Sequence, residues 1–167
     1  CMPGGKIVVY TGILPITQNE AGLAAVMGHE VAHALANHGQ QRMSAGQIQQ
    51  LASVGVAVAA SGQKESTQQI IGTAFGLGSQ FGFALPFGRS HETEADIIGQ
   101  QIMAIAGYDP LVAAQLWQRM KANAGGQAPP EFMSTHPSSD TRIRNLTNNA
   151  PAARAEATKF GVSKFKS

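Results

Sequence analysis

Apolar residues recur at helical spacing along most of the chain, and a strand-like pattern is confined to its beginning. Residues 6–14 are rich in β-branched side chains and predict a strand, which Pro15 ends. Helices are predicted over residues 18–38, 40–60, 65–82, 90–106 and 109–122, with another beginning at Ser138 or Ser139 and a last helical piece opened by Pro151. The pattern therefore predicts a mainly helical α+β fold with a small β-sheet near the N-terminus.

The helix predicted over residues 18–38 has recognisable signals at both ends. Thr17 and Glu20 have the spacing of a capping box, and Gly39 is placed as a C-cap. The segment His29-Glu30-Val31-Ala32-His33 lies in the middle of this helix. Two histidines four residues apart share one helical face, so both imidazoles can bind one metal ion.

Glu30 stands next to the first of these histidines and can reach a water held by the metal. This HExxH arrangement is typical of hydrolysis by a zinc-activated water, with the glutamate as general base. Catalytic zinc needs a third protein ligand and one open position. His38 does not fit that role, because on a straight helix it lies about 140° around from His33.

Glu92 is the better candidate for the third ligand. Glu92 and Asp96 are four residues apart on a predicted helix and therefore share a face. Glu92 can bind the metal while Asp96 accepts a hydrogen bond from a ligand histidine and fixes its tautomer. Glu94 and His91 are expected to point elsewhere, the first as a surface charge and the second as a residue that does not bind the metal.

Composition narrows the class of protein. The 167 residues suffice for a single domain, and a net charge of +2 gives no support for nucleic-acid binding. Cys1 is the only cysteine, so no internal disulfide can form. Residues 66–88 carry no charge but contain Gln68, Gln80 and several glycines. A buried or interfacial helical hairpin is therefore expected there, rather than a membrane-spanning helix.

Four sequence blocks together resemble metallopeptidase family 48. They are Pro3-Gly4-Gly5 with the following predicted strand, Gly28-His29-Glu30-Val31-Ala32-His33, Arg89-x-x-Glu92-x-x-Ala95-Asp96, and His136-Pro137 with Arg142 six residues after His136. That family includes HtpX-type heat-shock proteases, CAAX prenyl proteases, and mitochondrial and periplasmic envelope proteases. The resemblance covers about residues 3–146, and four blocks in the same order make it specific.

The resemblance implies a gluzincin-type zincin fold over residues 1–167, with further chain expected upstream. It implies one Zn²⁺ on His29, His33 and Glu92, with Glu30 as catalytic base, and it places His136 and Arg142 near the cleft. His136 and Arg142 are the candidates for a catalytic role in stabilising the oxyanion. His136 could instead block the open zinc position, and a purely structural role is its third alternative.

The function expected from this resemblance is a zinc endopeptidase that cleaves polypeptides in envelope protein quality control. A bacterial cell envelope is the expected location, either in the periplasm or on the membrane, with peripheral membrane contact left open. The alternative is a latent or chaperone-like assembly factor whose metal site is blocked by His136. The physiological substrate and the oligomeric state do not follow from the sequence.

Overall fold

Asn19 starts the helix that carries the HExxH motif. The computed structural model describes residues 7–123, 136 and 139–167, and in it the Asn19 side chain accepts a hydrogen bond from the Gly22 amide at 2.9 Å. Asn19 is therefore the N-cap, and the capping box predicted at Thr17 is wrong. The Thr17 hydroxyl donates to the Leu14 carbonyl instead.

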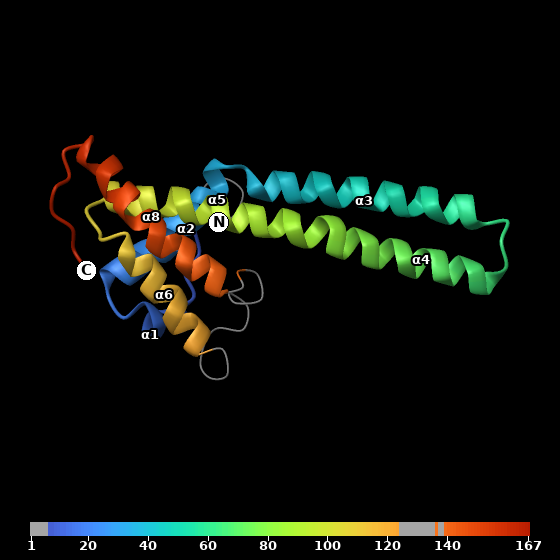
Figure 1. Cartoon of the computed structure of the whole chain (residues 1–167), viewed down its shortest axis with the longest axis horizontal. Coiled ribbons are helices and arrows are strands. Elements are labelled where there is room, and N and C mark those ends of the chain that lie inside the picture. Colours follow the sequence, from blue (N-terminus) through green and yellow to red (C-terminus); the bar gives the residue numbers. More distant parts are fainter. Residues whose placement is uncertain (1–6, 124–135, 137–138) are drawn as a thin grey trace. The chain divides into compact units, whose positions relative to one another are not determined.

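Helices account for most of the described chain. Their bounds are η1 Thr11–Ile13, α1 Leu14–Thr17, α2 Glu20–Leu35, α3 His38–Ala60, α4 Glu65–Ser79, η2 Gln80–Ala84, α5 Leu85–Ile105, α6 Leu111–Ala122 and α8 Asp140–Thr158. Here η1 is a 3-10 turn and η2 a π-helical turn. Figure 1 shows these elements in chain order.

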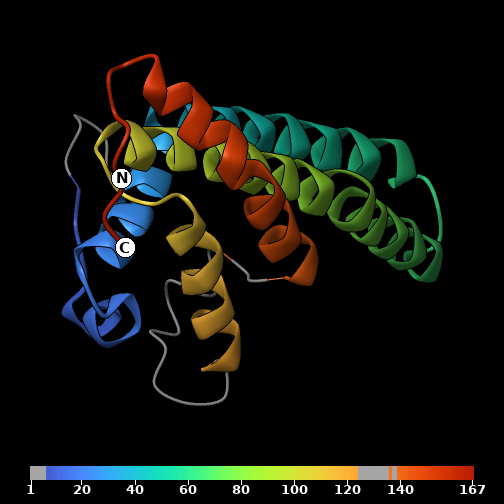
Figure 2. The same cartoon turned by 60° about the vertical axis from the view of Figure 1, so that its left-hand side comes forward.

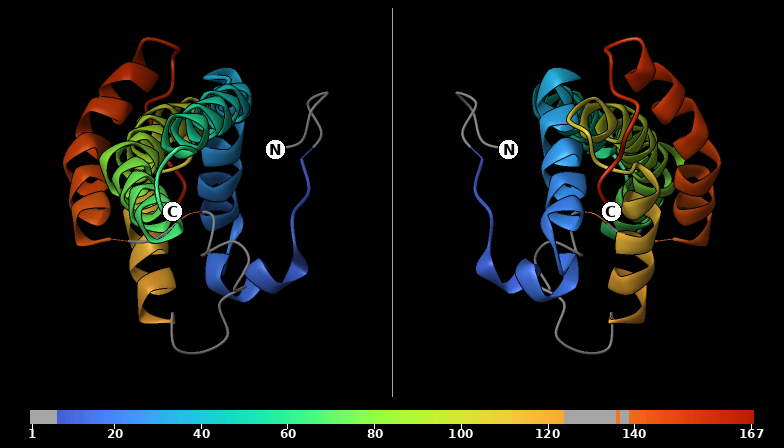
Figure 3. Two further views of the ribbon diagram at one scale, coloured as in Figure 1. Left: turned by 90° about the vertical axis from the view of Figure 1, so that its right-hand side faces the viewer. Right: turned by 90° about the vertical axis from the view of Figure 1, so that its left-hand side faces the viewer.

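The predicted small β-sheet is absent from the described residues. Residues 7–10 are extended but unpaired, and the chain turns into η1 and α1 where the predicted strand should continue. Figure 3 shows the segment as a plain trace leading into these turns. Residues 7–10 have a composition typical of a strand. A strand also needs a neighbour for its backbone hydrogen bonds, and none lies beside this segment in the described chain. An isolated bridge between Tyr108 and Lys166 is the only β pairing there.

The first long helix also ends earlier than predicted. Asn37 adopts a left-handed conformation with φ 55°, and asparagine is one of the few non-glycine residues that tolerate it. It separates α2 from α3, so His38 begins the second helix rather than ending the first. The gap between the helices predicted over residues 65–82 and 90–106 is also absent, because Pro86 occupies the first turn of α5, where proline is tolerated.

The chain forms two compact units. Unit 1 comprises residues 1–36 and 92–167, and unit 2 comprises residues 37–91. Unit 2 is a hairpin in which α3 and α4 run antiparallel (Figure 1). In unit 1, α6 and α8 lie side by side (Figure 2). The core of unit 1 is built around Met103, Leu116, Trp117, Met120 and Leu146, all nearly inaccessible to solvent.

Buried Gln100 joins three helices of unit 1. Its amide donates to the carbonyls of Pro110 and Leu146, and its carbonyl accepts from Asn149. A buried amide with its hydrogen bonds satisfied specifies one arrangement of the elements around it. The position of α5 is therefore fixed against α6 and α8, and α5 carries Glu92 and Asp96.

The helices α2 and α5 meet backbone to backbone in unit 1. A Cβ added at Gly28 would lie 2.7 Å from the Gly99 carbonyl oxygen, and one added at Gly99 would lie 2.8 Å from the His29 nitrogen. Only glycine permits helices to approach so closely at these positions. This contact brings the helix of the two histidines directly against the helix of Glu92.

Candidate active site

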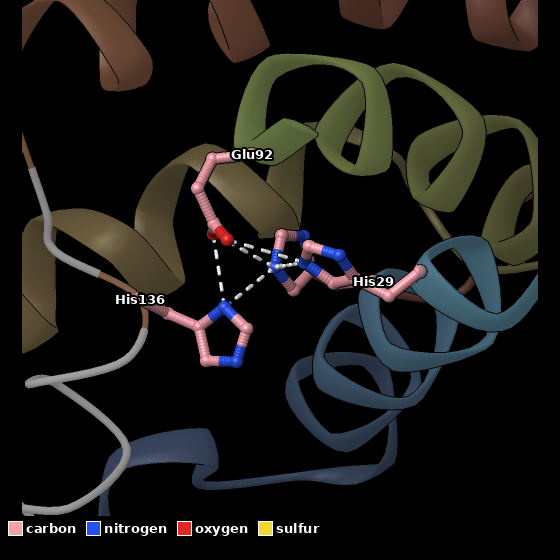
Figure 4. Close-up of side chains that lie close together, drawn as sticks. His29, Glu92 and His136 are labelled. Carbon is pink, nitrogen blue, oxygen red and sulfur yellow. Dashed lines mark hydrogen bonds and ion pairs between the residues drawn. The ribbon is translucent and has the colours of Figure 1, made fainter. Parts of the chain in front are cut away.

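Four side chains from three parts of unit 1 converge on one point. His29 and His33 come from α2, Glu92 comes from α5, and His136 precedes α8. One ligand atom from each lies within 4.8 Å of all the others, and all four residues are buried. Figure 4 shows the rings and the carboxylate pointing toward one another.

The spacing of these atoms fits a tetrahedral metal site. Zinc bonds of about 2.0–2.1 Å place tetrahedral ligand atoms roughly 3.3 Å apart. His33 Nε2 lies 3.1 Å from His29 Nε2 and 3.3 Å from Glu92 Oε1. His136 Nδ1 lies 3.2 Å from His29 Nε2 and 2.9 Å from Glu92 Oε2. Three imidazole nitrogens and one carboxylate oxygen are also the donor types that zinc prefers, so the residues fit this ion.

The other nitrogen of His29 faces a carboxylate. His29 Nδ1 lies 3.1 Å from Asp96 Oδ1, a distance at which the ring N–H donates to the carboxylate. With its proton on Nδ1, His29 presents the Nε2 lone pair to the centre of the site. Asp96 and Glu92 are thus on one face of α5, and each contacts a different nitrogen of the same ring.

Arg142 neutralises this buried carboxylate pair. Its Nε and Nη2 donate to the two oxygens of Asp96 at 2.5 and 2.8 Å, and its Nη1 lies 3.1 Å from Glu92 Oε2. Ser139 caps α8 by accepting a hydrogen bond from the Arg142 amide, which places Arg142 in the first helical turn. The guanidinium is almost fully buried and bound to carboxylates, an arrangement suited to positioning rather than to contact with a substrate.

Trp117 completes this network and was not singled out by sequence reasoning. The Arg142 guanidinium lies 3.5 Å from the centre of the Trp117 ring, and the same ring meets His29 edge-on at 5.7 Å. A cation over an indole face is a favourable contact, more so when buried. Trp117 has the spacing of an ordinary core residue of α6, so no local signal could have identified its contact with the site.

Glu30 lies beside the convergent group on the side of His136. The Glu30 carboxylate is 3.2 Å from His136 Nε2, while Nδ1 of the same ring faces Glu92. Burial raises the pKa of Glu30, but the hydrogen bond from His136 and its charge lower it further, so the net pKa is below the usual range. Glu30 is therefore ionised at neutral pH.

The remaining histidines lie outside this group. His38 stacks on His91 with ring centres 4.1 Å apart, and His91 contacts Gln41 at 2.9 Å. All three belong to unit 2. The prediction of His38 as a helix-end residue of α2 is wrong, because it is buried at the start of α3.

The metal-free site has a testable pH dependence. Burial lowers the pKa of His136, but the hydrogen bonds and charges of Glu30 and Glu92 outweigh it and raise the pKa above 6.5. Burial lowers the pKa of His33, and the hydrogen bond to Glu92 only partly offsets it. We expect NMR titration of the metal-free chain to show His136 deprotonating at a higher pH than His33.

The two shifts have opposite consequences for stability. A raised folded pKa means that protonated His136 stabilises the metal-free fold fully below its unfolded pKa, and this contribution is lost as the pH rises through the folded pKa. The contribution of His33 is present above its unfolded pKa and is lost as the pH falls through its lowered folded pKa. Equal pKa values for the two rings would contradict the asymmetric placement of the carboxylates.

Comparison with known proteins points to a single peptidase family. The family model described as Peptidase family M48 matches residues 1–150. Mitochondrial metalloendopeptidase OMA1 of Schizosaccharomyces pombe is 43% identical over 157 residues, which is 93% of this chain and 44% of that protein. The enzyme of the same name from Saccharomyces cerevisiae is 36% identical, over 91% of this chain and 43% of its own length.

A bacterial relative is more distant. Beta-barrel assembly-enhancing protease of Escherichia coli is 29% identical over 161 residues, which is 90% of this chain and 32% of that protein. This chain thus spans less than half the length of these relatives. No solved structure matches significantly. The family match over most of the chain and the convergent His/Glu group agree: the chain belongs to peptidase family M48, a family of zinc metallopeptidases.

Proposed function

We propose that this chain is the catalytic domain of a zinc-dependent endopeptidase that hydrolyses peptide bonds in polypeptides. The observation that carries the proposal is the buried tetrahedral set of three imidazoles and one carboxylate, with an ionised glutamate directly beside it. His29, His33 and Glu92 would hold the zinc. When bound, zinc supplies an activated water and polarises the scissile carbonyl.

Glu30 is proposed as the proton carrier. Its lowered pKa keeps the carboxylate ionised, and from its place beside the metal position it would take a proton from the attacking water and deliver it to the leaving amine. Asp96 holds His29 in the tautomer that presents Nε2, and Arg142 holds Asp96. Both are therefore proposed as positioning residues, in place of the catalytic role expected for Arg142.

His136 is proposed to occupy the fourth ligand position in a resting state. Its Nδ1 stands at ligand spacing from both His29 and Glu92, and its Nε2 faces Glu30. One ring therefore contacts the metal position and the base at once, which leaves no place for the attacking water. Displacement of His136 would free both groups, so this geometry favours latency over a permanently open site.

The biological setting is also proposed from the relatives. One is named as a mitochondrial metalloendopeptidase and another as a protease that enhances β-barrel assembly. The name of the bacterial relative supports the bacterial envelope, which remains the proposed location, whereas the name of the fungal relative places that protein in mitochondria.

Zinc content and proteolysis together test the proposal. We expect one zinc per purified chain by mass spectrometry, and cleavage of unfolded casein that is lost with a chelator and restored by zinc. A chain that binds no zinc after reconstitution, or that cleaves equally well with chelator present, would overturn the proposed function.

Replacement of His136 by alanine then distinguishes the two roles of this ring. If His136 blocks about nine-tenths of the molecules, its removal should raise the rate roughly tenfold with zinc retained. If it steadies the oxyanion instead, the rate should fall about 100-fold or more. The resting-state proposal fails in the second case, whereas the endopeptidase proposal stands in both.

A further inference from the structure

Unit 2 is a helical hairpin whose charged residues lie only at its two ends. Residues 43–63 carry no charge, and neither do residues 66–88. Arg42 and Arg89 lie at the end where the chain enters and leaves the unit, and Lys64 and Glu65 lie at the tip between the helices. Each uncharged run exceeds the about 20 residues that cross the hydrocarbon core of a bilayer.

The length of the hairpin matches a membrane. Between Arg42 and its end at Ala60, helix α3 has 18 residues, which at 1.5 Å per residue is about 27 Å, close to the about 30 Å thickness of a hydrocarbon core. Among the described helices, Glu65–Ile105 on the return path is the one that is long and apolar enough to span a membrane by length and composition, and the less apolar α3 would cross beside it. None of its most apolar window is buried within the protein, unlike the core helix of a water-soluble domain.

Large apolar side chains cover the outside of the hairpin. Helix α3 buries only His38 and Ala60, and α4 buries no residue at all. The exposed apolar residues are Met43, Ile48, Leu51, Val54 and Val58 on one arm and Ile70, Leu77, Phe81, Phe83 and Leu85 on the other. Contiguous apolar surface of this extent is rare on soluble monomers and marks a surface that something covers.

Two glutamines of the hairpin are hydrogen-bonded within it. Gln49 donates to the Ser79 hydroxyl at 3.0 Å and ties the two helices together along their seam. Gln68 donates to the carbonyls of Ser61 and Gln63 and closes the tip. Side-chain hydrogen bonds of this kind join helices inside membranes. Of the residues that led us to expect no spanning segment, Gln68 lies at the tip, whereas Gln80 and the glycines lie within the arm.

We propose that the hairpin of residues 42–89 inserts into a lipid bilayer, with Arg42 and Arg89 at one headgroup layer and the tip at the other. A second copy of the chain fits less well, because protein interfaces carry a polar rim that includes charged residues, and neither arm carries any charge between its ends. Only a bilayer requires helices to lack charge around their whole circumference over this length.

Flotation with vesicles tests the proposal. The full chain, purified in mild detergent, is reconstituted into phosphatidylcholine vesicles and floated through a density gradient after a high-salt wash. The native chain should float, because insertion depends on apolar surface and not on lipid charge. The Glu30→Gln chain should float equally, so failure of catalysis and failure of insertion can be told apart.

Arginine substitutions identify the segment responsible. Val54→Arg and Leu77→Arg place a charge in the middle of each arm, and each should weaken partitioning roughly 100-fold. Both positions are more than half exposed, so neither substitution disturbs packing. Phe160→Arg is the matched control, because Phe160 is equally exposed but lies outside unit 2, and that variant should float like the native chain.

Depth is measured in a chain with the substitutions Cys1→Ser and Val54→Cys, so that a thiol-reactive fluorophore labels position 54 alone. Its fluorophore should be quenched by lipids spin-labelled near the bilayer centre and not by those labelled at the headgroup. Flotation without central quenching would show a hairpin lying on the surface and would overturn the proposal. So would a native chain that stays at the bottom of the gradient, whether as a monomer or as a dimer.

Discussion

Glu30→Gln is expected to lower casein cleavage by about 10²–10⁴-fold while zinc content stays at the native level. Glutamine keeps the size of the side chain but cannot accept the proton of the attacking water. The Glu30 carboxylate is held 3.2 Å from His136 Nε2, and its lowered pKa keeps it in the ionised form that a base requires. The comparison is made on initial rates at equal zinc loading.

Glu94→Gln provides the control for this substitution. Glu94 is exposed on α5 two residues beyond Glu92, so the same chemical change is made close to the site but outside it. That variant should cleave casein at the native rate. Should Glu30→Gln keep more than a tenth of the native activity, Glu30 would not be the base, and the proposed route of the proton would be wrong.

Arg142→Ala is expected to lower the free energy of unfolding by about 3–5 kcal/mol, because it removes one partner of a buried ion pair. Both Arg142 and Asp96 have side chains only 5% exposed, so Asp96 would retain a buried charge without its cation. Urea unfolding followed by fluorescence of the single tryptophan measures the effect, since Trp117 lies under the guanidinium.

Arg144→Ala is the matched control on the same helix. Arg144 is exposed, and its removal should change the free energy of unfolding by no more than about 0.5 kcal/mol. If Arg142→Ala lowered the free energy of unfolding by less than about 1 kcal/mol, water or another cation would have to compensate the charge of Asp96. Arg142 would then not be the residue that holds the second carboxylate in place.

Much of the candidate site was accessible from local spacing. His29 with His33, and Glu92 with Asp96, are each separated by one helical turn, and a helix places such pairs on one face regardless of the rest of the fold. The family resemblance added His136 and Arg142, which no helical repeat connects to the other residues. The structure brings all six together in unit 1.

Other features depend on contacts between distant segments. Residues 7–10 have strand-like composition, yet pairing requires a partner that composition cannot supply. Helix α2 ends because Asn37 adopts a left-handed conformation, whereas the sequence favoured Gly39 as the C-cap. The spacing of Trp117 on its helix correctly indicates a core residue. Its contact with Arg142 forms only when α6 and α8 pack together, so no local pattern could predict it.

The backbone contact between Gly28 and Gly99 has a consequence for how this protein tolerates change. It sets the separation of the two metal-binding helices without any side chain, so repacking of the surrounding core leaves that separation intact. The same contact makes the metal geometry independent of whatever chain joins the helices. We therefore expect changes of length within residues 43–84 to leave that separation unaltered, provided that these two glycines remain.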